Sequence, residues 1–315
     1  MYDESQPPDD FRADVLRGLS TPDKRLACKY LYDETGSKLF EQICDLPEYY
    51  VTRTELDIMG RHAGEMAAML GPNCMLIEYG SGSSIKTRIL LDRMESPAAY
   101  VPVDIAREQL LEAAGALAAD YPAADVRPVH ADFTRPFALP DPARPARRRA
   151  VYFPGSTIGN FTPAEARALL AQSARLVGPG GALLLGADLK KDRRVLEAAY
   201  NDRAGVTAAF NLNLLRRINR ELDADFPVDE FRHHALFNED ESRIEMHLIS
   251  RRHQRVPVAG REIAFAQGES ICTEYSYKHS LAALQEIAEA AGFRVGKTWL
   301  DDQGYFSVIY LTVPG

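Results

Sequence analysis

Short apolar runs alternate with longer, helix-like segments from about Met75 onward. Parallel strands joined by crossover helices produce this alternation, because each strand is buried on both faces of its sheet. The expected strands are Met75–Tyr79, Ala99–Val103, Val126–His130, Ala150–Phe153 and Ala182–Gly186. The pattern predicts an α/β fold with a largely parallel sheet.

The segments between these strands carry Ala and Leu at intervals of three or four residues, as amphipathic helices do. The expected crossover helices are Ile85–Met94, Ala106–Asp120 and Pro163–Val177, the last preceded by a capping sequence that begins at Thr162. Nearer the C-terminus we expect a strand, a helix and a hairpin, at Arg243–Ser250, Ser280–Ala291, and Arg294–Leu300 with Tyr305–Val313. This hairpin supplies antiparallel edge strands.

Two stretches fall outside the alternation, residues 1–62 and 191–278. We expect them to form a second lobe beside a core made of residues 63–190 and 279–315. Segment 136–149 contains four prolines and four arginines, which predicts an exposed loop. A phosphate site made by these arginines is the alternative.

The composition indicates a globular protein. The chain has 315 residues, of which 46% are hydrophobic and 26% charged, enough to bury a core and to exclude wholesale disorder. Thirty-seven basic residues against forty-five acidic ones leave a net charge of −8, the wrong sign for a protein that neutralises phosphates along a duplex. We therefore expect no nucleic-acid partner.

The cysteines, histidines and apolar stretches restrict the compartment and the cofactors. The four cysteines are far apart, as is typical of reduced thiols, and none of the seven histidines has metal-ligand spacing. No apolar run is long enough for a membrane span, and the polar N-terminus does not read as a signal peptide. We expect a metal-free, monomeric, cytoplasmic protein without a membrane partner.

The loop after the first expected strand reads EYGSGSSIK, residues 78–86. Gly80 and Gly82 permit positive φ at the carboxyl end of the strand and let the backbone approach a ligand closely. A dinucleotide fingerprint needs a third glycine where this chain has Ile85, which argues against NAD. The loop predicts a nucleotide-type cradle.

Acidic residues follow the next two strands, Asp104 after the second and Asp132 with Phe133 after the third. This order resembles the S-adenosylmethionine (SAM) site of class I methyltransferases. In that family the first acid accepts the ribose hydroxyls, the second lies near the adenine amine, and the apolar residue lies against the ring. The alternative for Asp104 is helix capping.

Longer motifs extend the resemblance. Residues 32–55 read YDETGSKLFEQICDLPEYYVTRTE, residues 153–161 read FPGSTIGNF, and residues 273–278 read TEYSYK. Here the chain resembles the histidine-specific methyltransferases, which trimethylate the α-amine of L-histidine to hercynine in ergothioneine biosynthesis. The resemblance runs from about Tyr30 to the C-terminus. It departs at Val51, where the family pattern has proline, and at Ser83-Ser84, where Thr-Ser is commoner.

The resemblance implies a SAM-binding, Rossmann-like core and a substrate lobe made of the two leftover stretches. The implied cofactor contacts are Tyr32, Gly80, Lys86, Asp104, Asp132 and Phe133. The implied histidine contacts are Tyr49 at the α-amine, Asn160 and Tyr200 at the carboxylate, Glu274 and Ser276 at the imidazole, and Met246 lining the pocket.

The chemistry of these side chains suits the substrate. An imidazole needs an acceptor for its N–H and a second polar partner, and two positions two apart on a strand, such as Glu274 and Ser276, face the same side. The alternatives are a solvated strand for this pair, a turn role for Asn160 and core packing for Tyr200.

Transfer of a methyl group requires alignment of the amine with the sulfonium, and the amine must lose its proton. Tyr49 is the catalytic candidate, with a nearby carboxylate or water as alternatives. Two further functions stay open at this point: methylation of another amino acid or small amine, and non-catalytic SAM binding.

Overall fold

The computed structural model describes residues 2–3, 11–82 and 85–315. The chain divides into two compact units, which are described separately. The first comprises residues 1–6, 51–190 and 278–315, and the second residues 7–50 and 191–277. The observed boundary lies at Val51 rather than near residue 63, because residues 51–62 belong to a long helix that continues to Leu70.

The first unit contains an eight-stranded sheet in the order β1-β4-β3-β2-β5-β6-β13-β12. Neighbouring strands from β1 to β6 pair in parallel, and β13 and β12 add an antiparallel edge. The strands are β1 (Tyr2–Asp3), β2 (Cys74–Tyr79), β3 (Ala99–Asp104), β4 (Val129–His130), β5 (Arg148–Phe153), β6 (Ala182–Asp188), β12 (Arg294–Leu300) and β13 (Phe306–Thr312). The predicted α/β fold and edge hairpin are confirmed.

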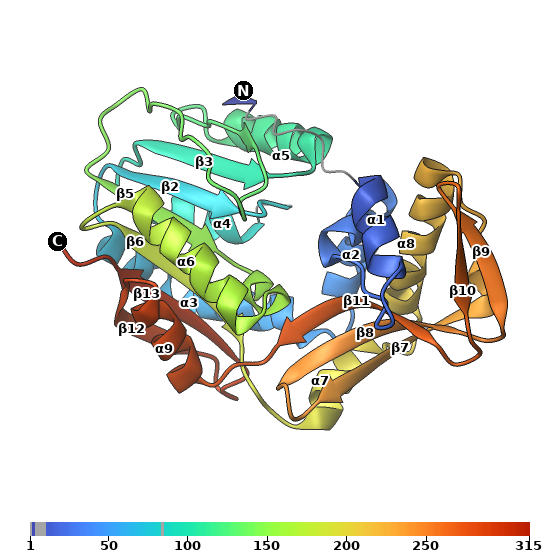
Figure 1. Ribbon diagram of the computed structural model, residues 1–315. Helices are drawn as coiled ribbons and strands as arrows, with labels where there is room; N and C mark the ends of the chain where they lie inside the picture. The colour runs from blue at the N-terminus through green and yellow to red at the C-terminus, as the bar shows by residue number, and fades with distance from the viewer. Residues whose placement is uncertain (1, 4–10, 83–84) are drawn as a thin grey trace. The chain divides into compact units, whose positions relative to one another are not determined.

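Helices cover both faces of this sheet. They are α3 (Tyr50–Leu70), α4 (Ile85–Leu91), α5 (Arg107–Asp120), α6 (Pro163–Val177) and α9 (Leu281–Ala290). In Figure 1, α6 and α9 lie in front of the sheet, and α3 and α4 lie behind it. Helix α6 begins at a complete capping box, in which Thr162 and Glu165 bond each other's backbone N–H, as the sequence predicts.

One predicted strand is largely wrong. The sequence predicts a continuous strand at Val126–His130, yet only Val129–His130 forms one. Residues 125–127 do bond to β3, through Tyr100 N to Asp125 O and Arg127 N to Tyr100 O. Pro128 follows, and it interrupts the ladder because proline has no N–H to donate.

The second unit combines helices with antiparallel strands. Its helices are α1 (Phe11–Leu19), η1 (Cys28–Leu31), α2 (Glu34–Cys44), α7 (Arg193–Tyr200), α8 (Val206–Leu222) and η3 (Val228–Glu230). A three-stranded sheet has the order β11-β8-β7, and a separate hairpin pairs β9 with β10. These strands are β7 (Phe231–Asn238), β8 (Arg243–Ser250), β9 (Gln254–Val258), β10 (Arg261–Phe265) and β11 (Ser270–Tyr277). Helices α2 and α8 pack together, fixed by Asp33, which caps α2 and accepts a hydrogen bond from Asn213.

Candidate functional site

The glycine loop and the ribose acid of the prediction lie together in the first unit. Gly80 and Gly82 have φ of +70° and +43°, the region that glycine adopts without strain. The Asp104 carboxylate at the end of β3 accepts hydrogen bonds from backbone N–H groups of this loop, at Ser81 and Gly82. Burial nevertheless raises the pKa of Asp104 above its ordinary value, and these bonds oppose the rise. Ser83 and Ser84 lie outside the described residues.

Asp104 is not the side-chain cap of α5. That helix has Ala106 at its N-cap and no side-chain bond there. Asp104 Oδ1 instead accepts from Ala106 N at 2.9 Å, which fixes the turn between β3 and the helix. The carboxylate therefore joins the strand end to the glycine loop.

Asp132 and Phe133 follow the neighbouring strand β4, whose His130 is in register with Asp104. Asp132 Oδ1 accepts from Thr134 N at 2.9 Å and from Thr134 Oγ1 at 2.6 Å. Phe133 stacks on Tyr79 with ring centroids 5.0 Å apart. The parallel strands thus bring both predicted adenine contacts to the same edge of the sheet as Asp104.

Lys86, in the first turn of α4, is paired with a residue that the sequence analysis did not single out. Its Nζ donates to Oε2 of Glu55 on α3. Glu55 also accepts from the backbone N–H of Gly155, at 3.2 Å and 2.9 Å to its two oxygens. Gly155 begins the loop that ends in Asn160, the last residue of the short helix η2 (Thr157–Asn160).

A second buried carboxylate lies at the end of β2. Glu78 accepts hydrogen bonds from Thr87 Oγ1, at 2.6 Å, and from the Tyr100 hydroxyl. Burial raises its pKa from the ordinary 4.5 to about 7, although both hydrogen bonds and the charge of Lys86 act in the opposite direction.

Five residues predicted around the substrate or the cofactor's methionine gather in the second unit. The Tyr49 and Tyr200 rings are 6.2 Å apart, and the Tyr200 hydroxyl donates to Ser276 Oγ at 2.9 Å. Burial is the main cause that raises the pKa of Tyr32 and Tyr49, and the charge of nearby Glu274 adds to both shifts. These five residues, Tyr32, Tyr49, Tyr200, Glu274 and Ser276, are called the aromatic cluster below.

Burial settles one of the alternative interpretations. Glu274 is 9% exposed and Ser276 3%, so β11 is not a solvated strand at these positions. Tyr200 is buried, and its hydroxyl is bonded to Ser276, another predicted substrate residue. Met246 pairs with Glu274 across the strands β8 and β11 and is likewise buried.

Comparison with known proteins identifies the family. Residues 11–313 match the family model described as "Histidine-specific methyltransferase, SAM-dependent". The chain belongs to the SAM-dependent, histidine-specific methyltransferases. The fold is accordingly that of class I methyltransferases, and SAM is the cofactor.

Individual members of this family are similar over nearly the whole chain. A histidine N-alpha-methyltransferase from Mycolicibacterium smegmatis is 45% identical over 95% of this chain and 93% of its own length. One from Mycobacterium tuberculosis is 42% identical over 95% and 93%. Ergothioneine biosynthesis protein 1 of Neurospora crassa is 29% identical over 84% of this chain and 32% of its own.

A solved structure supports the fold alone. A possible exported protein from Bordetella parapertussis aligns with a TM-score of 0.52 at 12% identity, over 96% of this chain and 93% of that one.

The motifs that carry the family resemblance contain two deeply buried carboxylates that the sequence analysis did not single out. Glu55 ends the TRTE motif, and Glu78 precedes the glycine loop. Both are almost fully buried, at 0% and 2% exposure. The only signal in the sequence is their position inside long motifs, since a single acid on a helix is usually solvated.

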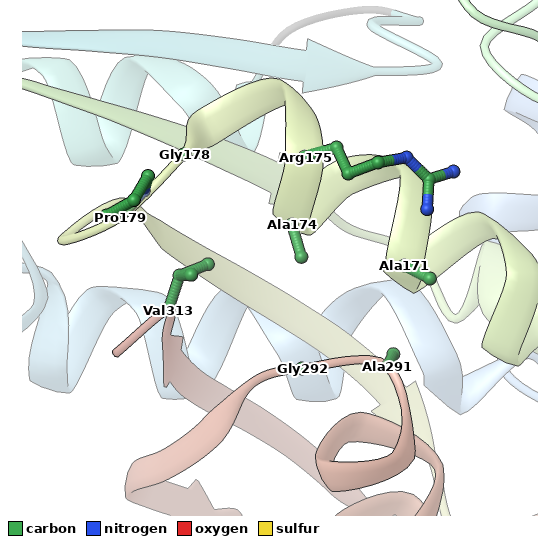
Figure 2. Close-up of a pocket in the computed structure, with 8 residues that line it drawn as sticks. All are labelled: Ala171, Ala174, Arg175, Gly178, Pro179, Ala291, Gly292 and Val313. Atoms are coloured by element: carbon green, nitrogen blue, oxygen red, sulfur yellow. The ribbon is translucent and has the colours of Figure 1, made fainter. Parts of the chain in front are cut away.

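The cavity in Figure 2 is a separate feature of the first unit and carries no residue of the predicted site. It is lined by the last turns of α6, the turn after α9, and Val313, with Arg175 as its charged residue. Within the described chain, no three side chains gather as metal ligands do, and no helix is long and apolar enough to cross a membrane.

Proposed function

We propose that this protein transfers the methyl group of SAM to the α-amine of L-histidine, three times in succession, to give hercynine for ergothioneine biosynthesis. The observation that carries the proposal is the aromatic cluster, which places Glu274, Ser276, Tyr200 and Tyr49 together in a chain of this family. The histidine N-alpha-methyltransferases and ergothioneine proteins among its relatives support the substrate and the pathway.

The first unit fits the cofactor. Two glycines with positive φ and the Asp104 carboxylate beside them form the backbone cradle and hydroxyl acceptor that a nucleoside requires. Lys86, whose charge is balanced by Glu55, donates hydrogen bonds to the carboxylate of the methionine part. Asp132 and Phe133 stand at the adenine end of the same edge. When bound, SAM supplies an electrophilic methyl group on a positively charged sulfur.

Glu274 and Ser276 provide the polar groups for the imidazole. A carboxylate accepts from the ring N–H, and the serine hydroxyl bonds the other nitrogen. Analogues without these nitrogens cannot form either hydrogen bond, which costs binding free energy. We therefore expect the site to reject phenylalanine.

Tyr200 connects the two ends of the bound amino acid. Its hydroxyl has one hydrogen, which Ser276 accepts in this structure. Binding of the substrate carboxylate turns this hydrogen toward the ligand and releases Ser276 Oγ from the bond. We expect the bond between the substrate carboxylate and Tyr200 to favour engagement of the imidazole in this way.

Tyr49 is the proposed contact of the reacting amine. Burial raises the pKa of its phenol well above the usual value, so the group keeps its proton at neutral pH. Tyr49 therefore orients the amine as a neutral hydrogen-bond partner, and the proton displaced by each methyl group leaves through water. The ring faces of Tyr49 and Tyr200 stabilise the resulting methylated ammonium by cation–π attraction.

We also propose that the first unit is the SAM-binding core, that the second is the substrate lobe, and that the protein acts as a monomer in the cytoplasm without nucleic-acid or membrane partners. The net charge of −8 supports the proposal that the protein has no nucleic-acid partner. The cysteines of the described chain form no disulfide, which supports the proposed cytoplasmic location. Sedimentation at micromolar concentration tests the monomer.

Mass spectrometry tests the function. The protein is incubated with SAM and, separately, with L-histidine, L-tryptophan and L-phenylalanine. We expect histidine to gain up to three methyl groups and the other amino acids to remain unmodified. Tryptophan is included because an L-tryptophan methyltransferase from Psilocybe serbica is 26% identical over 96% of this chain. Preferential methylation of tryptophan, or no methylation at all, would overturn the proposal.

A further inference from the structure

Glu55 is a fully buried carboxylate in the first unit, on the helix α3. It pairs with the Lys86 ammonium, whose side chain is 18% exposed, and accepts the Gly155 backbone N–H with both oxygens. Lys86 belongs to the helix after the glycine loop, and Gly155 begins the loop that ends in Asn160. One carboxylate therefore holds two segments that carry predicted ligand contacts.

The residues around Glu55 leave room for its side chain. Gly186, on β6, leaves the space that Glu55 occupies, because a Cβ at that position would lie 2.2 Å from Glu55 Oε1. Gly155 lies close to the cation, since a Cβ built there would be 3.6 Å from Lys86 Nζ. The carboxylate, the ammonium and the loop backbone thus form one packed arrangement.

Stability alone is a weak reason for this arrangement. Burying two charges costs desolvation that their attraction offsets only partly, and well-packed apolar residues often do as well. The charge of Lys86, however, would be unfavourable for the binding of SAM if it were not balanced. SAM carries two positive groups and one carboxylate, so the cofactor has a net positive charge, and an unpaired lysine beside it would repel it.

We propose that Glu55 is a positioning residue of the methyl transfer, which fixes Lys86 and the Gly155 loop and cancels the lysine's charge so that a cationic cofactor can bind beside it. The inference rests on the proposed function, because that function supplies the roles of Lys86 and Asn160. It adds a requirement of its own, namely discrimination between SAM and S-adenosylhomocysteine, the product, which has no net charge.

The test measures the affinity of both cofactors by calorimetry for Glu55→Gln. This substitution keeps the shape of the side chain and removes its charge, so Lys86 is left uncompensated. We expect SAM affinity to fall by about tenfold or more and S-adenosylhomocysteine affinity to fall less. The matched control is Glu65→Gln, on the same helix, which breaks an exposed pair with Lys297 and is expected to leave both affinities unchanged.

A second substitution separates charge from packing. In the double variant Glu55→Gln, Lys86→Met the charge balance is restored, so the ratio of SAM to S-adenosylhomocysteine affinity should return toward that of the unmodified protein. A lowered unfolding temperature with both affinities and their ratio unchanged would overturn the proposal, because the role would then be structural only. If Glu55→Gln does not fold, Glu55→Asp replaces it: a partial loss of SAM affinity supports the proposal, and an unchanged affinity overturns it.

The same measurements keep the two proposals apart. If the unmodified protein binds SAM but methylates no histidine, the proposed function fails while the Glu55 result still stands or falls on the affinity ratio. If it methylates histidine and Glu55→Gln leaves the ratio unchanged, only the inference on Glu55 fails.

Discussion

Glu78 gives the protein a pH dependence that a surface carboxylate would not. Its pKa is raised from 4.5 to about 7 by burial. Between these two values the folded protein keeps a proton that the unfolded chain has lost, so the free energy of unfolding falls as the pH rises. Below about pH 4.5 this effect is absent, and above about pH 7 the loss is complete, at about 3 kcal/mol.

Glu78→Gln removes the titration and should remove this slope. Urea unfolding at several pH values from 5 to 8 measures it in both proteins. We expect the unmodified protein to lose stability relative to Glu78→Gln across this range. Parallel pH profiles for the two proteins would show that Glu78 is ionised in the fold.

Substitution of Glu274 tests how the protein recognises the imidazole of histidine. Glu274→Ala leaves the ring N–H of histidine without its acceptor, and a hydrogen bond to a charged group contributes about 1.5–3 kcal/mol. We expect histidine affinity to fall by about ten- to hundredfold, while S-adenosylhomocysteine affinity stays the same. Calorimetric titration with each ligand measures both values. Equal weakening of the two ligands would contradict the role given to Glu274.

At the scale of the elements, the sequence predicts the helices and strands whose formation depends on neighbouring residues. The apolar run at β2 and the capping box at α6 are local, and both predictions are confirmed within one residue. The strand predicted at Val126–His130 fails because Pro128 interrupts the pairing although the residues around it are apolar. Glu55 escapes prediction for a different reason, since its burial arises from contacts with residues 31 and 100 positions away.

The arginine-rich segment shows the same limit of local patterns. The sequence predicts an exposed loop there, but Arg148 already belongs to β5 and is half-buried. Its guanidinium donates to Met69 O at 2.6 Å, to Leu70 O at 3.3 Å and to the Tyr310 hydroxyl at 2.9 Å. A cation at the carbonyl end of α3 satisfies groups that every helix leaves unpaired.

Arg148→Ala should therefore destabilise the first unit. Loss of these hydrogen bonds and of the favourable charge at the helix end is expected to lower the free energy of unfolding by about 1–3 kcal/mol. The control is Arg149→Ala, whose exposed side chain makes a longer bond of 3.5 Å to Leu176 O. Chemical denaturation compares the two variants. A similar loss in both would mean that the segment contributes through its general charge and not through this contact.

On the scale of the whole molecule, the alternation of strands and helices predicts the first unit, and the stretches outside this alternation predict the second. The boundary between the two units is not predictable in this way. Nothing in the sequence of α3 marks Val51 as the point of division, because the helix continues through it from Tyr50 to Leu70. The other boundaries are also close to regular structure. The chain leaves the second unit directly after β11, at Tyr277, and Lys278 then forms a buried ion pair with Asp188 at 2.8 Å.

This continuity predicts how the protein unfolds. Melting of the second unit alone would leave α3 frayed at its start and would expose the chain beside the buried Lys278–Asp188 pair, so we expect one cooperative transition. S-adenosylhomocysteine at a hundred times its dissociation constant adds about 2.7 kcal/mol to the free energy of unfolding, which corresponds to a rise of about 4 °C in the transition temperature. Differential scanning calorimetry with and without the ligand measures this shift. A single peak that moves as a whole supports coupled unfolding, whereas two peaks of which only one moves would show that the units melt independently.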